Sequence, residues 1–181
     1  SVLSADVFVL LCSIILFMYK TALQPLVDNS SRILILGTMP GDQSIAKQQF
    51  YGNKGNHFWK IMFTIFQEDY IASYEDRKIF LKKHKIALWN VLASCVREGS
   101  SDSKITNESI NDFVSFHKQY PNIQHVFFES KSAAKFYHKY ATPQAGVSYH
   151  ILPSTSGLNA GTSFSQKVEM WKILAETAHS F

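Results

Sequence analysis

Short apolar runs alternate along the chain with longer amphipathic stretches. The first run, 33–36, ends at Gly37 and predicts a buried strand that stops at a tight turn. Three further runs, at 86–92, 125–128 and 147–152, predict three more strands. Helices are expected where apolar residues recur at helical spacing or where charged residues gather: 58–66, 75–84, 106–120, 130–140 and 164–178.

Strands that alternate with helices indicate parallel pairing through right-handed crossovers, with helices on both faces of the sheet. We therefore expect an α/β fold, a three-layer α/β/α sandwich with a central four-stranded, mainly parallel sheet. In such sheets ligands bind beyond the carboxyl ends of the strands. The glycine-bearing loops that follow 33–36 and 147–152 should meet at one end of the sheet, so we expect the functional site there.

The N-terminal part of the chain carries an apolar segment at 7–18, interrupted by one serine. It is shorter than the ~18–20 residues needed to span a bilayer, and it lacks the charged start and cleavage site of a signal peptide. We interpret 1–20 as an extension or a helix packed on the protein, and 21–181 as one domain. A membrane anchor, an export signal and a self-association surface remain the alternatives. We expect a soluble, cytoplasmic, bacterial-type monomer.

The composition fits a folded domain with a substantial core. Of 181 residues, 46% are hydrophobic and 18% are charged, which excludes a disordered chain. A net charge of +4 is compatible with binding a polyanion without establishing it. Cys12 and Cys95 are too few for an iron–sulfur cluster, and no histidines stand at ligand spacing for zinc. We therefore expect no metal and no cofactor.

The segment after the first strand carries the most informative chemistry. Residues 37–41 read Gly-Thr-Met-Pro-Gly, and such small side chains let backbone N–H groups approach a ligand closely. The lysine and hydroxyl that a phosphate-binding loop places after its second glycine are absent at that spacing. Aromatic and amide side chains follow instead at 48–51 and 56–59. They suit a flat, uncharged ring with hydrogen-bonding edges, such as a nucleobase.

Three ordered segments, 37–59, 88–102 and 152–160, resemble the uracil-DNA glycosylase superfamily and are most similar to its hypoxanthine-DNA (deoxyinosine) glycosylase branch. The resemblance runs from Thr21 to the C-terminus. It implies a monofunctional DNA glycosylase of base excision repair that hydrolyses the N-glycosidic bond of a deaminated base, hypoxanthine first, in damaged DNA. A uracil or mismatched-pyrimidine glycosylase of the same fold and a catalytically silent nucleic-acid-binding relative remain the alternatives.

The resemblance places the catalytic asparagine at Asn56, near the start of a predicted helix. Related branches carry an amide or acid at the position of Met39, and a thioether cannot orient water, so that role must have moved. An amide is a weak base, so Asn56 would position the attacking water rather than deprotonate it. Asparagine is also a favoured helix cap, and the two roles are compatible.

The expected base pocket combines one aromatic residue with the loop after the first strand. The resemblance implies that the ring of Tyr51 stacks on the flipped base; Phe50 beside it could take the same role, and core packing is the alternative for Tyr51. The remaining pocket residues are expected to be Gly37, Thr38, Met39, Pro40 and Gly41.

DNA contacts are expected from the second glycine-bearing loop and from a polar loop upstream of it. Hydroxyl groups can donate to phosphates beside a flipped nucleotide. Leu158 could fill the vacated base stack as a wedge, or it could pack under its loop. Related branches carry a histidine where this chain has Leu152, so a catalytically silent nucleic-acid-binding relative remains an alternative. The expected DNA-binding residues are Ser154, Thr155, Ser156, Gly157, Leu158, Asn159, Arg97 and Ser100.

Overall fold

The computed structural model describes residues 7, 9, 10, 14 and 18–181. The interpretation of the apolar segment 7–18, and of Cys12 within it, lies largely outside these residues. Within the part of the chain that is described, no helix has both the length and the apolar character to cross a membrane.

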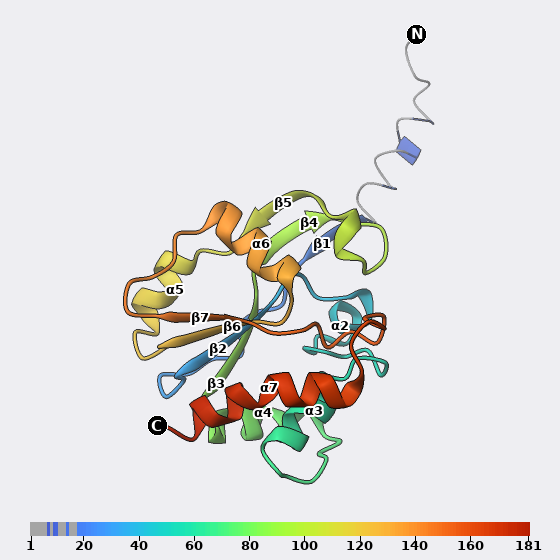
Figure 1. The fold of residues 1–181 in the computed structure, drawn as a ribbon. Helices are drawn as coiled ribbons and strands as arrows, with labels where there is room; N and C mark the ends of the chain where they lie inside the picture. The colour runs from blue at the N-terminus through green and yellow to red at the C-terminus, as the bar shows by residue number, and fades with distance from the viewer. Residues whose placement is uncertain (1–6, 8, 11–13, 15–17) are drawn as a thin grey trace.

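A four-stranded parallel sheet lies at the centre of the molecule (Figure 1). Its strands are β2 (Ile33–Gly37), β3 (Ile86–Asn90), β6 (His125–Phe128) and β7 (Ser148–Ile151), in the order β3-β2-β6-β7. Each neighbouring pair runs parallel. Every residue of β2 is buried, as expected for a central strand covered on both faces. The predicted α/β fold with four core strands is confirmed.

Helices cover both faces of this sheet and create two separate cores. On one face, Ile33 and Ile35 of β2 pack with residues of α3 (Phe58–Ile65), α4 (Tyr74–Lys83) and α7 (Phe164–Ala178). On the other face, Leu34 and Leu36 pack with residues of α5 (Phe113–Gln119) and α6 (Lys131–Tyr140). Alternate side chains of one apolar strand thus enter opposite layers.

Polar side chains set the start of four of these helices. Ser73, Asp112, Ser130 and Ser163 each accept a hydrogen bond from a backbone N–H of the first turn. Such caps satisfy donors that have no partner within the helix. At α7 the cap is reciprocal, because the side chain of Gln166 accepts from the Ser163 N–H.

The prediction of one helix over 106–120 is wrong in its first half. Thr106–Ile110 forms β5, which pairs antiparallel with β4 (Leu92–Val96). β4 also pairs with β1 (Tyr19–Thr21), giving a second sheet in the order β1-β4-β5. Pairing with a distant strand overrides the local helical preference, and neither this sheet nor the short helix α2 (Asp42–Lys47) was predicted.

The second sheet continues directly from β3 and brings the chain alongside the loop that follows β2. The N–H groups of Val91 and Leu92 donate to the carbonyls of Gly37 and Thr38. Asn111, after β5, donates its side-chain amide to the carbonyls of Asn90 and Leu92. These bonds fix the loop after β2 at the carboxyl end of the parallel sheet.

Candidate active site

The loops that follow β2, β4, β6 and β7, with the last residue of β3, line one cavity at the carboxyl ends of the parallel strands. Its volume is about 1040 Å³. Gly37 from the first loop, Asn90 and Glu129 from the ends of β3 and β6, and Gly157 from the last loop all contribute to its wall. Asn56, which precedes α3, lies on the same wall. The two glycine-bearing loops therefore meet where the strand order predicted.

Thr155 joins three of the segments that line the cavity. Its N–H and its hydroxyl donate to Glu129 Oε1 at 2.8 and 2.7 Å. Its carbonyl accepts from the N–H of His57 at 2.9 Å. Thr155 is completely buried, so its hydroxyl bonds within the protein and is not exposed at the surface. This placement corrects the expectation that Thr155 contacts DNA.

The last loop also packs closely against the segment that precedes Asn56. A Cβ placed on Gly157 would lie 2.4 Å from the carbonyl oxygen of Gly55, closer than real Cβ atoms approach other atoms. A side chain at this position would therefore push the two loops apart. The glycine at position 157 is required by this close approach.

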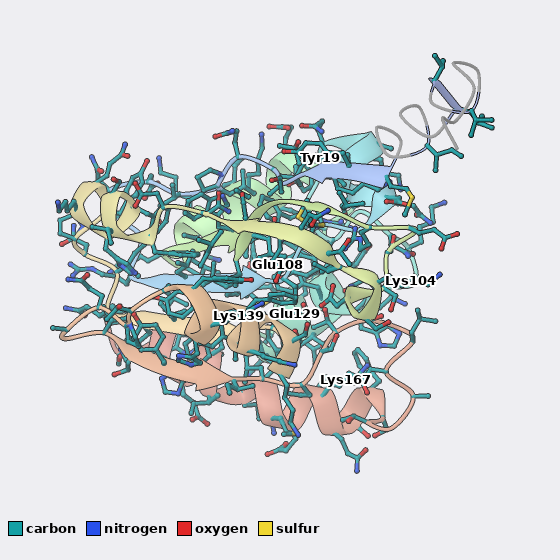
Figure 2. All side chains as sticks on the ribbon, turned by 90° about the horizontal axis from the view of Figure 1, so that it is seen from above. Tyr19, Lys104, Glu108, Glu129, Lys139 and Lys167 are labelled. Atoms are coloured by element: carbon teal, nitrogen blue, oxygen red, sulfur yellow. The ribbon has the colours of Figure 1, made fainter. Side chains whose placement is uncertain are left out.

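Two side chains of α7 hold the same loop from the core side. Trp171 Nε1 donates to the carbonyl of Pro153, and Lys167 Nζ donates to the carbonyl of Ser156, both at 3.0 Å. Lys167 is almost completely buried, and this burial lowers its pKa. Lys167 on α7 and Glu129 after β6 thus approach the loop from different layers (Figure 2).

Asn56 lines the cavity wall and bonds to the first residue of the following helix at the same time. Its Oδ1 accepts from the N–H of Phe58 at 2.8 Å. The N-cap of α3 is His57, which has no side-chain cap, so Asn56 is the residue before the cap and the expected capping role is wrong by one position. A carbonyl oxygen has a second lone pair, which can accept from a water molecule. Within the described part of the chain, its side-chain nitrogen has no hydrogen-bond partner.

Tyr51 has one ring face packed against Phe58, with ring centroids 3.6 Å apart and an angle of 10° between the rings. Its backbone φ of 54° lies in the left-handed region, which is rare for an aromatic residue. Burial and the nearby Glu129 raise the pKa of its hydroxyl well above the usual value. Phe50 also touches the cavity, but it is 4% exposed and belongs to the core around α3.

Three polar groups converge beside Gly37. A Cβ at this glycine would lie 3.2 Å from Asn90 Nδ2, 3.7 Å from Tyr51 Oη and 3.9 Å from Glu129 Oε2. Asn90 is buried, and its Oδ1 has no hydrogen-bond partner among the described residues. An amide with a free acceptor and a nearby carboxyl group form a polar floor that can read the edge of a ring.

Glu129 was not among the expected site residues. The signal in the sequence is a charged residue directly after the apolar strand 125–128, at the end of the sheet where ligands bind. Burial raises the pKa of its carboxyl to about 7, although the hydrogen bonds from Thr155 act in the opposite direction. The negative charge of Asp102 raises the pKa further. Asn90 lies within the segment 88–102 that resembles the family, but it was not itself expected to be a site residue. Its position at the carboxyl end of β3 is the signal that could have identified it.

The remaining residues of the first loop line the cavity as expected. Thr38, Met39, Pro40 and Gly41 all contribute to its wall. Met39 is 7% exposed and packs into the core that includes Leu36. The buried Thr38 hydroxyl has no partner among the residues that the structure describes.

Arg97 is completely buried and supports the first loop from behind. Its guanidinium donates to the carbonyls of Pro40 and Gly99 and lies 3.8 Å from Asp102. This corrects the expectation that Arg97 contacts DNA, because its charge is used inside the protein. Ser100 is exposed at the cavity and accepts from the N–H of Asp42 at 3.0 Å.

The tip of the last loop carries the most exposed large apolar side chain near the cavity. Leu158 is 93% exposed, so the alternative that it packs under its loop does not hold. Ser154, Ser156 and Asn159 stabilise the loop through short-range bonds and also line the cavity. Leu152, by contrast, is buried in the core beneath α7.

Metal-ligating side chains do not gather at this site. Among the described residues, no group of three or more histidine, cysteine, aspartate or glutamate side chains is arranged to hold a metal ion.

Comparison with known proteins adds independent findings. Residues 24–176 match the family model of the Uracil DNA glycosylase superfamily. A protein named Hypoxanthine DNA glycosylase from Methanosarcina barkeri (strain Fusaro / DSM 804) is 38% identical over 151 residues, covering 83% of this chain and 94% of the relative. A protein of the same name from Methanosarcina acetivorans is 37% identical over 160 residues, covering 87% and 98%.

A solved structure agrees with these sequence matches. The solution NMR structure of a candidate uracil DNA glycosylase from Methanosarcina acetivorans matches with a TM-score of 0.76 and 34% identity. The match covers 90% of this chain and 99% of the other. Together these findings confirm the family resemblance inferred from the three sequence segments.

We predict that Gly157→Ala destabilises the protein and loosens the contact between the two loops. The added Cβ would overlap the Gly55 carbonyl, and overpacking of this kind typically costs about 1–3 kcal/mol. Urea unfolding gives the stability, and amide hydrogen exchange at His57, which donates to Thr155, gives the state of the contact. Gly161→Ala is the matched control, because a Cβ at Gly161 meets nothing within 4 Å. Equal behaviour of the two variants would contradict the prediction.

Proposed function

We propose that this chain, which belongs to the uracil DNA glycosylase superfamily, is a monofunctional DNA glycosylase that releases hypoxanthine from deoxyinosine in DNA. Hydrolysis of an N-glycosidic bond needs a base outside the stack, a water molecule at the anomeric carbon and stabilisation of charge on the departing base. The observation that carries the proposal is that Tyr51, Asn56, Asn90 and the exposed Leu158 line the same cavity.

Hypoxanthine suits the polar floor of this cavity. On its six-membered ring the base presents a carbonyl acceptor beside an N–H donor. The amide of Asn90, which lines the cavity and has its Nδ2 beside Gly37, is the proposed partner of this pair. The names of the two relatives support the same base. Uracil presents a similar carbonyl and N–H pair, so it is the competing substrate.

The aromatic wall supplies the stacking energy for the flipped base. One face of Tyr51 is taken by Phe58, and the residue also lines the cavity. The other face of the ring is the proposed platform for the base. Stacking of a base on an aromatic side chain contributes about 1–3 kcal/mol.

Asn56 is the proposed water-positioning residue. Its Oδ1 is already fixed by the Phe58 N–H, which removes the rotational freedom of the side chain. The second lone pair of that oxygen can then accept from the attacking water. An amide cannot take a proton, so the reaction depends on a weak nucleophile that attacks a developing oxocarbenium ion.

DNA is the proposed partner, bound along the rim of the cavity. Ser100, Ser154, Ser156 and Asn159 line the cavity with hydroxyl and amide groups that can contact the phosphates beside the flipped nucleotide. Leu158 is the proposed wedge at the vacated position in the stack. A monomer in the cytoplasm remains the prediction for the state of the protein in the cell.

Two matched duplexes test the proposal, one with a single deoxyinosine and one with a single uracil, in buffer that contains EDTA. We expect strand cleavage after alkali treatment of the deoxyinosine duplex, because the proposed mechanism uses an oriented water molecule and no metal. Cleavage of the uracil duplex alone would replace hypoxanthine by uracil as the substrate. Binding of both duplexes without an abasic product would identify a silent relative.

Asn56→Ala should lower the single-turnover rate on deoxyinosine by ~10²-fold or more, with a much smaller loss of DNA binding. A group that orients water acts mainly in the transition state, so kcat should fall more than affinity. Asn56→Asp is the control, because it keeps an acceptor for the Phe58 N–H. Loss of the hydrogen bond to the Phe58 N–H alone costs only about 1 kcal/mol of stability. Equal losses of binding and rate in Asn56→Ala would indicate a purely structural role.

Leu158→Ala should slow excision from a well-paired duplex more than from a mismatched one, and it should barely affect single-stranded substrate. Flipping from a stable pair needs more unstacking energy, part of which a wedge offsets. Because the side chain is 93% exposed, we expect the free energy of unfolding to change by less than about 0.5 kcal/mol. Rates on the three substrates, measured beside a urea melt, test this. A uniform decrease on all three would exclude the wedge.

A further inference from the structure

Glu129 presents one carboxyl oxygen to the cavity and uses the other to hold the last loop. Oε1 accepts from the N–H and hydroxyl of Thr155 and from the hydroxyl of Ser154, at 2.8, 2.7 and 3.3 Å. Oε2 has no hydrogen bond to any residue that the structure describes, and it lies 3.9 Å from where a Cβ on Gly37 would be. The carboxyl group is thus fixed at one oxygen and available at the other.

Among the three groups that converge beside Gly37, Glu129 alone is suited to release a proton near neutral pH. The amide of Asn90 can donate a hydrogen bond but does not ionise. The pKa of the Tyr51 hydroxyl lies well above its usual value, which makes it a poor acid. Burial brings the pKa of Glu129 to about 7, close to the optimum for proton transfer at physiological pH.

Several other charged or titratable side chains surround this carboxyl group. Asp102 raises the pKa of Glu129, and Lys167 is close enough for the charge of Glu129 to raise the lysine pKa. Lys167 donates a hydrogen bond to the Ser156 carbonyl, and its ammonium forms no bond to this carboxyl group among the described residues. Asp42 and His57 also line the cavity.

We propose that Glu129 is the general acid of the reaction and delivers a proton from Oε2 to N7 of the departing purine. The inference rests on the proposed function and adds a catalytic residue to it. The C1′–N9 bond breaks, and its electron pair stays with the base. Because N7 gains the proton, hypoxanthine leaves as a neutral molecule. The water oxygen bonds to C1′ and releases its proton to the solvent, and the Glu129 carboxylate takes up a proton from the solvent before the next turnover.

Proton delivery assists departure of the base, the step of this hydrolysis that an oriented water molecule does not assist. Asn56 can orient water without activating it, so departure of the base must provide most of the driving force. A purine that departs without a proton carries a negative charge into a site already lined by acidic groups. General acid catalysis typically contributes 10²–10⁴-fold.

Single-turnover rates on deoxyinosine DNA between pH 5 and 9 test the assignment in wild-type protein and in Glu129→Gln. Glutamine keeps the size and the hydrogen bonds to Thr155 but has no transferable proton. We expect the wild-type rate to fall about tenfold per pH unit above roughly pH 7, as the acid ionises. Glu129→Gln should be about 10²-fold slower at pH 6 and independent of pH. Parallel profiles for the two proteins would overturn the assignment.

Thr155→Val moves the same pH profile if the acid is Glu129. The Thr155 hydroxyl lowers the pKa of this carboxyl, so its loss should shift the alkaline decline to higher pH, and Thr155→Ser should restore the original position. His57 also lines the cavity and provides the control. His57→Gln should therefore keep the alkaline decline, whatever its rate. Loss of the decline in His57→Gln would assign it to the histidine and overturn the proposal.

Unfolding in urea reports on the Glu129 proton without any activity. A carboxyl group whose pKa is raised on folding binds its proton more tightly in the folded state. Wild-type stability should therefore fall relative to Glu129→Gln as pH rises from about 4.5 to about 7. If the stability of the wild-type protein does not fall relative to that of Glu129→Gln over this pH range, the proposal is overturned. Absence of excision by the wild-type protein would overturn the proposed function together with this role, whereas normal excision by Glu129→Gln would overturn the general acid alone.

Discussion

The site depends on Thr155, whose three polar groups are all used to join neighbouring loops. Its N–H and hydroxyl bind Glu129 after β6, and its carbonyl receives the N–H of His57 beside Asn56. A buried residue that satisfies every donor and acceptor in this way fixes the relative position of the segments it joins. The close packing of Gly157 on Gly55 adds a steric limit to the same arrangement. The distance between Asn56, the proposed water-positioning residue, and the Glu129 carboxyl group is therefore set by the protein itself before substrate arrives.

The core of the fold could be predicted because local pattern and burial agree there. The run 33–36 is apolar at every position, and each residue is completely buried between two helical layers. The segment 106–120 could not be predicted in the same way. Its first half is polar, and it becomes a strand because β4 offers an antiparallel partner about ten residues upstream. Strand formation of this kind depends on the partner and not on the segment alone.

The site was predictable where a motif marks it and not where single residues meet. The loop 37–41, Tyr51 and Asn56 follow one another in the sequence, and all of them line the cavity. Asn90 and Glu129 stand alone at the ends of separate strands, and their relation to Gly37 exists only in the folded chain. Arg97 shows the opposite difficulty. An arginine in a polar loop is normally exposed, yet the Pro40 carbonyl holds this one inside.

The central claim, hydrolysis of deoxyinosine by an oriented water in this cavity, is tested most directly by the fate of isotopically labelled water. A duplex with one deoxyinosine is treated with the protein in H₂¹⁸O, and the products are analysed by mass spectrometry without delay. The account predicts free hypoxanthine without ¹⁸O and an abasic sugar that carries one ¹⁸O at C1′. Absence of released hypoxanthine, or a covalent protein–DNA adduct trapped by borohydride, would contradict it.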